Sequence, residues 1–219
     1  MKLSHSRRHL LRLGVASAAA ALPLPSIARA WAEAAQQAQL SEQDRIDVAR
    51  IEQYLNGLGS VKASFQQYTE SEGLAFGRIY LRRPGRMRVE YDPPSEILLV
   101  ADGTLLSYYD AELNHIEQVP LKLSPMWFLL RNDVRLGGDV TVTRFQRKSD
   151  NILIGLVQSD EPDAGSVQLE FGDKPLELRQ WTITDSAGTQ VRVGLYDAQF
   201  GVELANDLFA TPRKKPRNK

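Results

Sequence analysis

Polar and apolar residues alternate along most of the chain between residues 60 and 200, which is the pattern of β-strands with one buried face. In RMRVEY, for example, Met87, Val89 and Tyr91 share one side of the strand while charged residues occupy the other. The pattern predicts a sheet that is wet on one face and apolar on the other.

Eleven stretches carry this alternation, and turn signals such as Asp102-Gly103 and residues 185–188 separate them. The expected strands are 62–70, 74–83, 86–92, 96–101, 104–109, 113–119, 139–148, 151–159, 165–172, 176–184 and 188–197. Mostly short turns between them favour antiparallel neighbours. We therefore predict a mainly β fold with a few helices, in which about eleven strands form one strongly curved or partly closed antiparallel sheet.

A helical period precedes the strands. Ser41 is expected to cap a helix that runs to about Leu58, with Asp44 in its first turn and a stop signal at residues 56–59. Packing on the sheet is the simplest role for its apolar stripe, which consists of Val48, Ile51, Leu55 and Leu58.

One short segment, SPMWFLL at residues 124–130, is apolar on every side. Ser124 and Pro125 are expected to be the cap and the first position of a helix that ends near residue 131. A surface helix keeps one polar side, and a bilayer span needs about 20 apolar residues. On the residues alone, core filling is favoured over a cover with a second apolar face. The apolar residues are Met126, Trp127, Phe128, Leu129 and Leu130.

Residues 1–30 have the features of a cleaved export signal: a basic start, an apolar run and the small residues of Ala28-Arg29-Ala30. We expect cleavage after Ala30, with Ala30-Trp31-Ala32 as an alternative. A retained membrane anchor is less favoured because prolines interrupt the apolar run. SRRHLLR at residues 6–12 fits the twin-arginine pattern, but adjacent arginines are also common in ordinary secretory signals, so the export route stays open.

Loss of the signal leaves residues 31–219, enough for one domain with a sizeable core in residues 31–212. It also changes the net charge from 0 to −5, because five of the 27 Lys and Arg residues and no acidic residue lie in 1–30. Five more basic residues lie in the tail 213–219, so residues 31–212 carry −10. An acidic body argues against nucleic acid as a partner. The tail, which we expect to be disordered, is either a solvated end or a contact with an anionic membrane surface.

The chain lacks the residues that several kinds of catalysis and metal binding require. The chain has no Cys, and His115 is the only His beyond residue 30, which argues against thiol chemistry and most metal sites. His115 itself is placed like a strand residue that faces water. Asp102 and Asp110 lie in turn-like stretches, which gives little support to hydrolysis by paired carboxylates. We expect no enzyme activity, no catalytic residue, no cofactor and no metal, and keep a hydrolase that depends on His115 as an alternative.

Arg83 is the charged residue that stands out. In GRIYLRR it shares one side of a strand with Ile79 and Leu81, so the apolar face ends in a guanidinium. A buried cation needs partners, whereas one at a rim extends into water. Both placements fit the pattern.

Several short motifs between residues 40 and 212 follow one another in a characteristic order and spacing. They are Phe65-Gln66-Gln67, RPGRMR at 83–88 followed by Tyr91-x-x-Pro94, VADG at 100–103 with YYD at 108–110, SPMWFLLRN, Leu169-x-Phe171, and Trp181-x-Ile183-x-Asp185-x-x-Gly188. In this order they resemble the periplasmic outer-membrane lipoprotein carrier proteins (LolA-like).

The resemblance implies an unclosed antiparallel β-barrel whose helical lid covers an apolar cavity. Arg83, before Pro84, would hold the lid closed through hydrogen bonds to backbone carbonyls, which break when lipid enters. The lid itself would be Met126, Trp127, Phe128, Leu129 and Leu130. The residues expected to line the lipid cavity are Phe65, Ile79, Leu81, Met87, Val89 and Tyr91.

The function implied by the resemblance is a periplasmic chaperone, expected to be monomeric, that carries lipoproteins. Its partners would be acylated lipoproteins as cargo, an inner-membrane ABC transporter as donor and an outer-membrane acceptor. Acceptors of this family carry an acylated N-terminal Cys, which this chain lacks, so the soluble carrier type is implied.

The chain departs from the family at its end. LFATP at residues 208–212 runs directly into RKKPRNK, without the glycine and the apolar extension common in the carriers. This leaves the identity of the acceptor open, and with it an alternative: a LolA-like protein that binds or carries a different lipid or amphiphile.

Overall fold

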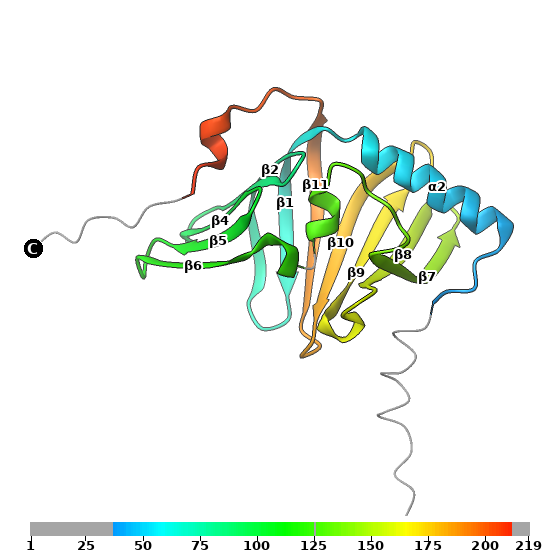
Figure 1. The fold of residues 1–219 in the computed structure, drawn as a ribbon. Helices are drawn as coiled ribbons and strands as arrows, with labels where there is room; N and C mark the ends of the chain where they lie inside the picture. Colours follow the sequence, from blue (N-terminus) through cyan, green and yellow to red (C-terminus); the bar gives the residue numbers. More distant parts are fainter. Residues whose placement is uncertain (1–36, 125, 212–219) are drawn as a thin grey trace, which may run out of the picture.

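The computed structural model describes residues 37–124 and 126–211, which form one curved, eleven-stranded sheet with a helix across part of its concave side (Figure 1). The strand order is β6-β5-β4-β3-β2-β1-β11-β10-β9-β8-β7, and every neighbouring pair is antiparallel. The first and last strands therefore pair at the centre, while β6 and β7 form the two edges. The sheet is open between these edges, as the predicted unclosed barrel requires.

All eleven predicted strands are present, and no strand end lies more than three residues from its expected position. The alternation located them because each strand presents one face to an apolar interior. Their bounds are β1 Ser60–Thr69, β2 Gly73–Arg82, β3 Arg86–Tyr91, β4 Ile97–Asp102, β5 Leu105–Asp110, β6 His115–Pro120, β7 Val140–Lys148, β8 Asn151–Gln158, β9 Gly165–Gly172, β10 Glu177–Asp185 and β11 Gln190–Phe200.

Helix α2 (Glu42–Gly57) confirms the predicted helix and its cap. The Ser41 hydroxyl accepts a hydrogen bond from the Asp44 backbone N–H at 3.2 Å, and the Asp44 carboxylate accepts one from the Ser41 N–H at 2.9 Å. This reciprocal pair satisfies two of the free N–H groups at the start of the helix. The helix lies across the β7–β10 half of the sheet (Figure 1) and buries Ile51 and Leu55 completely.

The segment between β6 and β7, residues 121–139, crosses from one edge of the sheet to the other. It contains two 3₁₀ turns, η1 (Leu121–Leu123) and η2 (Trp127–Leu130), where we predicted a helix capped by Ser124. Ser124 has the extended backbone of an N-cap residue, and its hydroxyl oxygen accepts a hydrogen bond from the Met126 N–H at 3.4 Å, but a 3₁₀ turn follows in place of the predicted helix. Pro125 lies outside the described residues.

The end of η2 explains why this segment does not continue as a helix. The carbonyls of Leu129 and Leu130 accept hydrogen bonds from Arg83 Nε and the Gly85 N–H, both at 2.7 Å. A longer helix would need these carbonyls for its own next turn. The turn between β2 and β3 thus terminates the segment and fixes its position.

A cluster of charged side chains fastens α2 to the far half of the sheet. Arg147 on β7 contacts Asp173 at 2.6 Å and Asp47 of α2 at 2.5 Å, and Arg50 of α2 forms ion pairs with the same two carboxylates. Asp47 and Asp173 are almost fully buried, so each needs the two arginines that it has. No pattern in the sequence predicts this cluster.

The described part of the chain ends on the convex face of the sheet, where η4 (Asn206–Phe209) packs against β3 and β4. Arg82 donates to the Leu204 carbonyl and to Asn206, and its guanidinium lies over the ring of Phe209. The predicted signal (1–30) and basic tail (213–219) lie outside the described residues. No helix of the described segments is long and apolar enough to cross a membrane.

Candidate functional site

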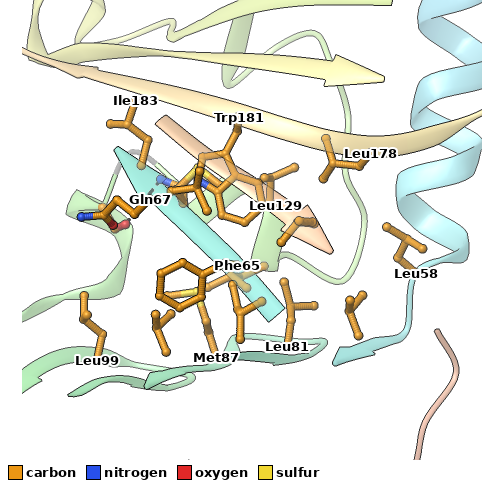
Figure 2. A pocket seen from close by; sticks show the side chains of 18 of the residues that line it. Leu58, Phe65, Gln67, Leu81, Met87, Leu99, Leu129, Leu178, Trp181 and Ile183 are labelled. Carbon is orange, nitrogen blue, oxygen red and sulfur yellow. Dashed lines mark hydrogen bonds between the residues drawn. The ribbon is translucent and has the colours of Figure 1, made fainter. Parts of the chain in front are cut away.

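The concave side of the sheet encloses an apolar cavity of about 320 Å³ between the two halves of the sheet (Figure 2). Its size falls at the lower end of the range for small-molecule sites in proteins. Of the side chains that line it, only Gln67, Arg83 and Ser124 are neither aliphatic nor aromatic. The others are Leu55, Leu58, Val61, Phe65, Ile79, Leu81, Met87, Val89, Tyr91, Leu99, Leu106, Met126, Leu129, Leu130, Leu178, Trp181, Ile183, Val191, Val193, Leu195 and Phe200.

The structure places all six of the residues expected to line a cavity in this wall. They are inward-facing residues of the three neighbouring strands β1, β2 and β3. The pairing of these strands places them side by side, because Ala63 pairs with Ile79, and Ile79 pairs with Val89. The six are Phe65, Ile79, Leu81, Met87, Val89 and Tyr91.

Glycine at position 77 gives the wall its shape. In the register Gly77 stands between Phe65 on β1 and Tyr91 on β3, and a Cβ there would lie 2.7 Å from the Phe65 ring. Because position 77 has no side chain, the two rings meet edge to face over it, with their centroids 5.2 Å apart. The same Cβ would lie 2.0 Å from the Glu90 carbonyl oxygen, so a larger residue would displace the backbone of β3 as well as the Phe65 ring.

Arg83 closes one end of the cavity. Its Nε donates to the Leu129 carbonyl, and its Nη1 donates to the carbonyl of Leu55 near the C-terminus of α2. Within the described segments no carboxylate forms an ion pair with it, so carbonyl dipoles, including the negative end of the helix, balance its charge. Burial lowers the pKa of Arg83 to about 10, which still leaves it charged at neutral pH.

The predicted lid residues divide between two environments. Met126, Leu129 and Leu130 line the cavity. Phe128 points away from it and is buried in the main core, and Trp127 packs under the guanidinium of Arg131, 5.0 Å from its ring centroid. Pro84 is exposed in the turn next to Arg83 and lines no part of the cavity. A segment that is apolar on every side therefore serves both a core and a cavity.

A polar pair lies at the opposite end of the cavity from Arg83. Tyr91 donates its hydroxyl hydrogen to Gln67 Oε1 at 2.7 Å, and burial raises the pKa of the Tyr91 hydroxyl. Figure 2 shows Gln67 at one side of the pocket, between Ile183 and Leu99, with Leu58 beside α2 at the other side. Gln67 was not among the residues expected to line the cavity.

The residues considered for catalysis lie elsewhere. His115 is exposed on the edge strand β6, where its register partner is Asp110. Among the residues that the structure describes, no three His, Cys, Asp or Glu side chains are placed to hold a metal ion. The cavity itself offers van der Waals surface and a few hydrogen-bonding groups.

The sequence of the chain matches the family described as "Outer membrane lipoprotein carrier protein LolA" over residues 56–212, well over half of its length. The chain belongs to the LolA family. The match confirms the predicted resemblance, and it includes every strand that lines the cavity.

Two curated relatives of this LolA-family chain are both named outer-membrane lipoprotein carrier protein. The one from Chromobacterium violaceum is 26% identical over 76% of this chain and 84% of its own length. The one from Methylobacillus flagellatus is 25% identical over 74% of this chain and 82% of its own length. A solved LolA superfamily protein from Nitrosomonas europaea is 11% identical, covers 75% of this chain and 97% of its own, and superposes with a TM-score of 0.43.

One side of the cavity wall of this LolA-family protein was not predicted. It comes from β10 and β11, whose inward residues also alternate, so a period-two signal was available in the sequence. The pattern of a single strand does not predict that β1 pairs with β11. This pairing places the inward residues of β10 and β11 opposite β2 and β3. The wall residues from these two strands are Leu178, Trp181, Ile183, Val191, Val193, Leu195 and Phe200.

Proposed function

We propose that this protein is a non-enzymatic periplasmic carrier that binds the acyl chains of lipoproteins in its cavity. It takes them from an inner-membrane ABC transporter and delivers them to an outer-membrane acceptor. The observation that carries this proposal is the apolar cavity under the crossing segment 121–139 in a chain of the LolA family. The names of the curated relatives support the same cargo.

The energetics explain why such a carrier is needed. Each CH₂ of an acyl chain gains about 0.8 kcal/mol when it leaves water. A free lipoprotein with several chains would therefore not leave a membrane without an apolar container. The wall of this cavity, with three polar side chains among its lining residues, supplies one.

A carrier must also release its cargo. Arg83 holds the empty state closed by bonds to the Leu55 and Leu129 carbonyls, and these bonds are lost when a chain separates the lid from α2. Their loss offsets part of the gain from burial. Binding is thereby weak enough for onward transfer.

The end of the chain favours one alternative. Because LFATP at residues 208–212 is followed by the basic run RKKPRNK and not by the glycine-containing pattern of the family, a LolA-like protein that carries a different lipid or amphiphile is the second candidate. The same cavity would serve it, and only the cargo and the delivery step would differ.

A release assay separates these possibilities. Spheroplasts that synthesise a radiolabelled outer-membrane lipoprotein are incubated with the purified protein, and the supernatant is examined for labelled lipoprotein bound to it. We expect release that depends on cellular ATP. Displacement of a hydrophobic dye by other lipids without lipoprotein release would support the alternative cargo, and absence of both activities would refute the carrier proposal.

A further inference from the structure

The Gln67–Tyr91 pair is the feature of the cavity that a purely apolar container does not need. Gln67 lies on the inward face of β1, two residues beyond Phe65, and its carboxamide is part of the cavity wall. Gln67 is half-exposed, so its carboxamide can reach both water at the mouth of the cavity and a ligand inside it.

Only one side of the Gln67 carboxamide is satisfied within the protein. Oε1 accepts the hydrogen bond from Tyr91, which fixes the orientation of the amide. Among the described residues none accepts a hydrogen bond from Nε2, although this group has two hydrogens to donate. Tyr91 is itself held by its ring contact with Phe65 over Gly77. The pair is therefore a positioned donor that lacks an acceptor.

The Gln67 donor lies at the entrance of the cavity. Gln67 and its neighbours Ile183 and Leu99 are half-exposed, so the cavity opens to water at the Gln67 end. Leu58 beside α2 is half-exposed as well, whereas Leu55 and Leu178 are buried. Gln67 is six positions along β1 from Val61, which is paired with Leu81 on β2. Six positions correspond to about 20 Å along a strand.

An acyl chain has one polar group that matches this arrangement. Its methyl end and methylenes need apolar wall, and its other end carries a carbonyl oxygen in an ester or amide, which accepts hydrogen bonds and has no hydrogen to donate. A chain that enters methyl end first would place this oxygen at the entrance, where Nε2 is available.

Resting on the proposed function, we propose that Gln67, oriented by Tyr91, binds the carbonyl oxygen of an ester-linked or amide-linked acyl chain at the entrance of the cavity. The chain then extends toward Arg83 with its methyl end under α2 and η2. This gives the site a preference for acyl chains over alkyl chains of equal length.

The test is dye displacement from the protein purified after expression of the whole chain. Three probes share a C16 chain: 1-monopalmitoylglycerol with an ester, palmitoylethanolamide with an amide, and 1-O-hexadecylglycerol with an ether. We expect the ester and the amide to displace dye at concentrations about 2- to 10-fold lower than the ether, the range for one neutral hydrogen bond. An advantage for only one of the two would identify the linkage that the site accepts.

Variants locate the effect. Gln67→Met keeps the length of the side chain without its donor, and should reduce the ester-to-ether ratio to about one while the ether binds as before. Tyr91→Phe should reduce the ratio partly, and it tests the pair independently if Gln67→Met fails to fold. The matched control is Gln66→Met, because Gln66 is the next residue of β1 but contacts Tyr196 on the opposite face.

The results distinguish two failures. If all three probes displace dye equally, or if the ratio persists in both variants, the inference is wrong and the apolar carrier stands. If no probe displaces dye, the proposed function fails as well.

Discussion

The two halves of the sheet are built from the same kind of strand, yet one is packed solid and the other is hollow. Inward residues of β8 and β9, such as Ile152, Ile154 and Phe171, have no exposed surface, because helix α2 covers them. Inward residues of β3 and β4, such as Met87 and Leu99, are half-exposed and line the cavity. The difference lies in what covers each half, since the alternation of the strands is alike in both.

This contrast separates stability from function within one core. In the packed half an apolar side chain is stabilised by its neighbours, and the interior tolerates little change of volume. In the hollow half the same residue types keep apolar surface available for a ligand. The same kind of substitution should therefore change stability in the packed half and ligand binding in the hollow half.

The largest expected effect is truncation in the packed half. Phe171 contacts Tyr54 edge to face at 5.9 Å, and Phe171→Ala should lower the free energy of unfolding by about 3–5 kcal/mol. Met87→Ala, its counterpart in the hollow half, should cost about 1 kcal/mol or less, because Met87 already borders empty space. Urea denaturation followed by circular dichroism measures both, and equal losses would contradict the comparison.

Enlargement should affect stability in the packed half and ligand binding in the hollow half. Val142→Phe adds a ring where β7 packs under the core and should destabilise the protein by about 1–3 kcal/mol. Val89→Phe adds the same ring to the cavity wall, so it should leave the unfolding free energy within about 1 kcal/mol but weaken binding of a hydrophobic dye severalfold. Dye binding that survives Val89→Phe unchanged would place the ligand elsewhere.

The contact between the halves is expected to control release. Arg83→Leu removes the bonds that favour the empty, closed state, so bound lipid should be retained and transfer to acceptor membranes should fall about tenfold, a change of 1.4 kcal/mol. Arg82→Leu is the matched control, since Arg82 contacts the C-terminal segment on the convex face. Faster transfer by Arg83→Leu would mean that these bonds do not oppose loading.

The smallest expected effect concerns the charged cluster behind the packed half. Hydrogen bonds from Arg50 and then Arg147 lower the pKa of Asp173. The unfolded chain binds this proton more readily than the folded one, so the stabilisation is complete above the unfolded pKa of about 3.9 and is lost as pH falls through the lower folded pKa. Asp173→Asn should therefore reduce stability at pH 7 and lose that difference in acid.

Unfolding curves of the two proteins from pH 7 down to pH 2 test this expectation. A difference in unfolding free energy that stays constant over this range would exclude titration of Asp173 as its source. Dye binding at pH 7 should be the same in both proteins, because no residue of the cluster lines the cavity.

The sequence predicted the strands and helix α2 because each depends on a local period, whereas the six cavity residues were expected from the resemblance to the LolA family. Met87, Val89 and Tyr91 face the cavity for the same reason that they alternate with arginines. It failed where the structure depends on distant partners. The 3₁₀ turn at Trp127–Leu130 ends because Arg83 and Gly85 take its carbonyls, and no pattern within residues 124–131 contains that information.

The remaining gaps have the same origin. Asp47 reads as a polar position of an exposed helix, and only the approach of Arg147, 100 residues away, makes its burial possible. Gln67 reads as part of a short motif on β1, and its role as a wall residue requires Tyr91 from β3.

The central pairing of β1 with β11 also has a consequence for the order of folding. Hairpins β2–β6 and β7–β10 join strands that are close in sequence, so they can form early, whereas Val61 must find Phe200 across most of the chain. Closing that loop is the slow, entropically costly event. The cavity needs walls from both sides of this seam, so a chain has no binding site until its last strand is in place. An incomplete or partly folded copy is thereby unable to take up cargo.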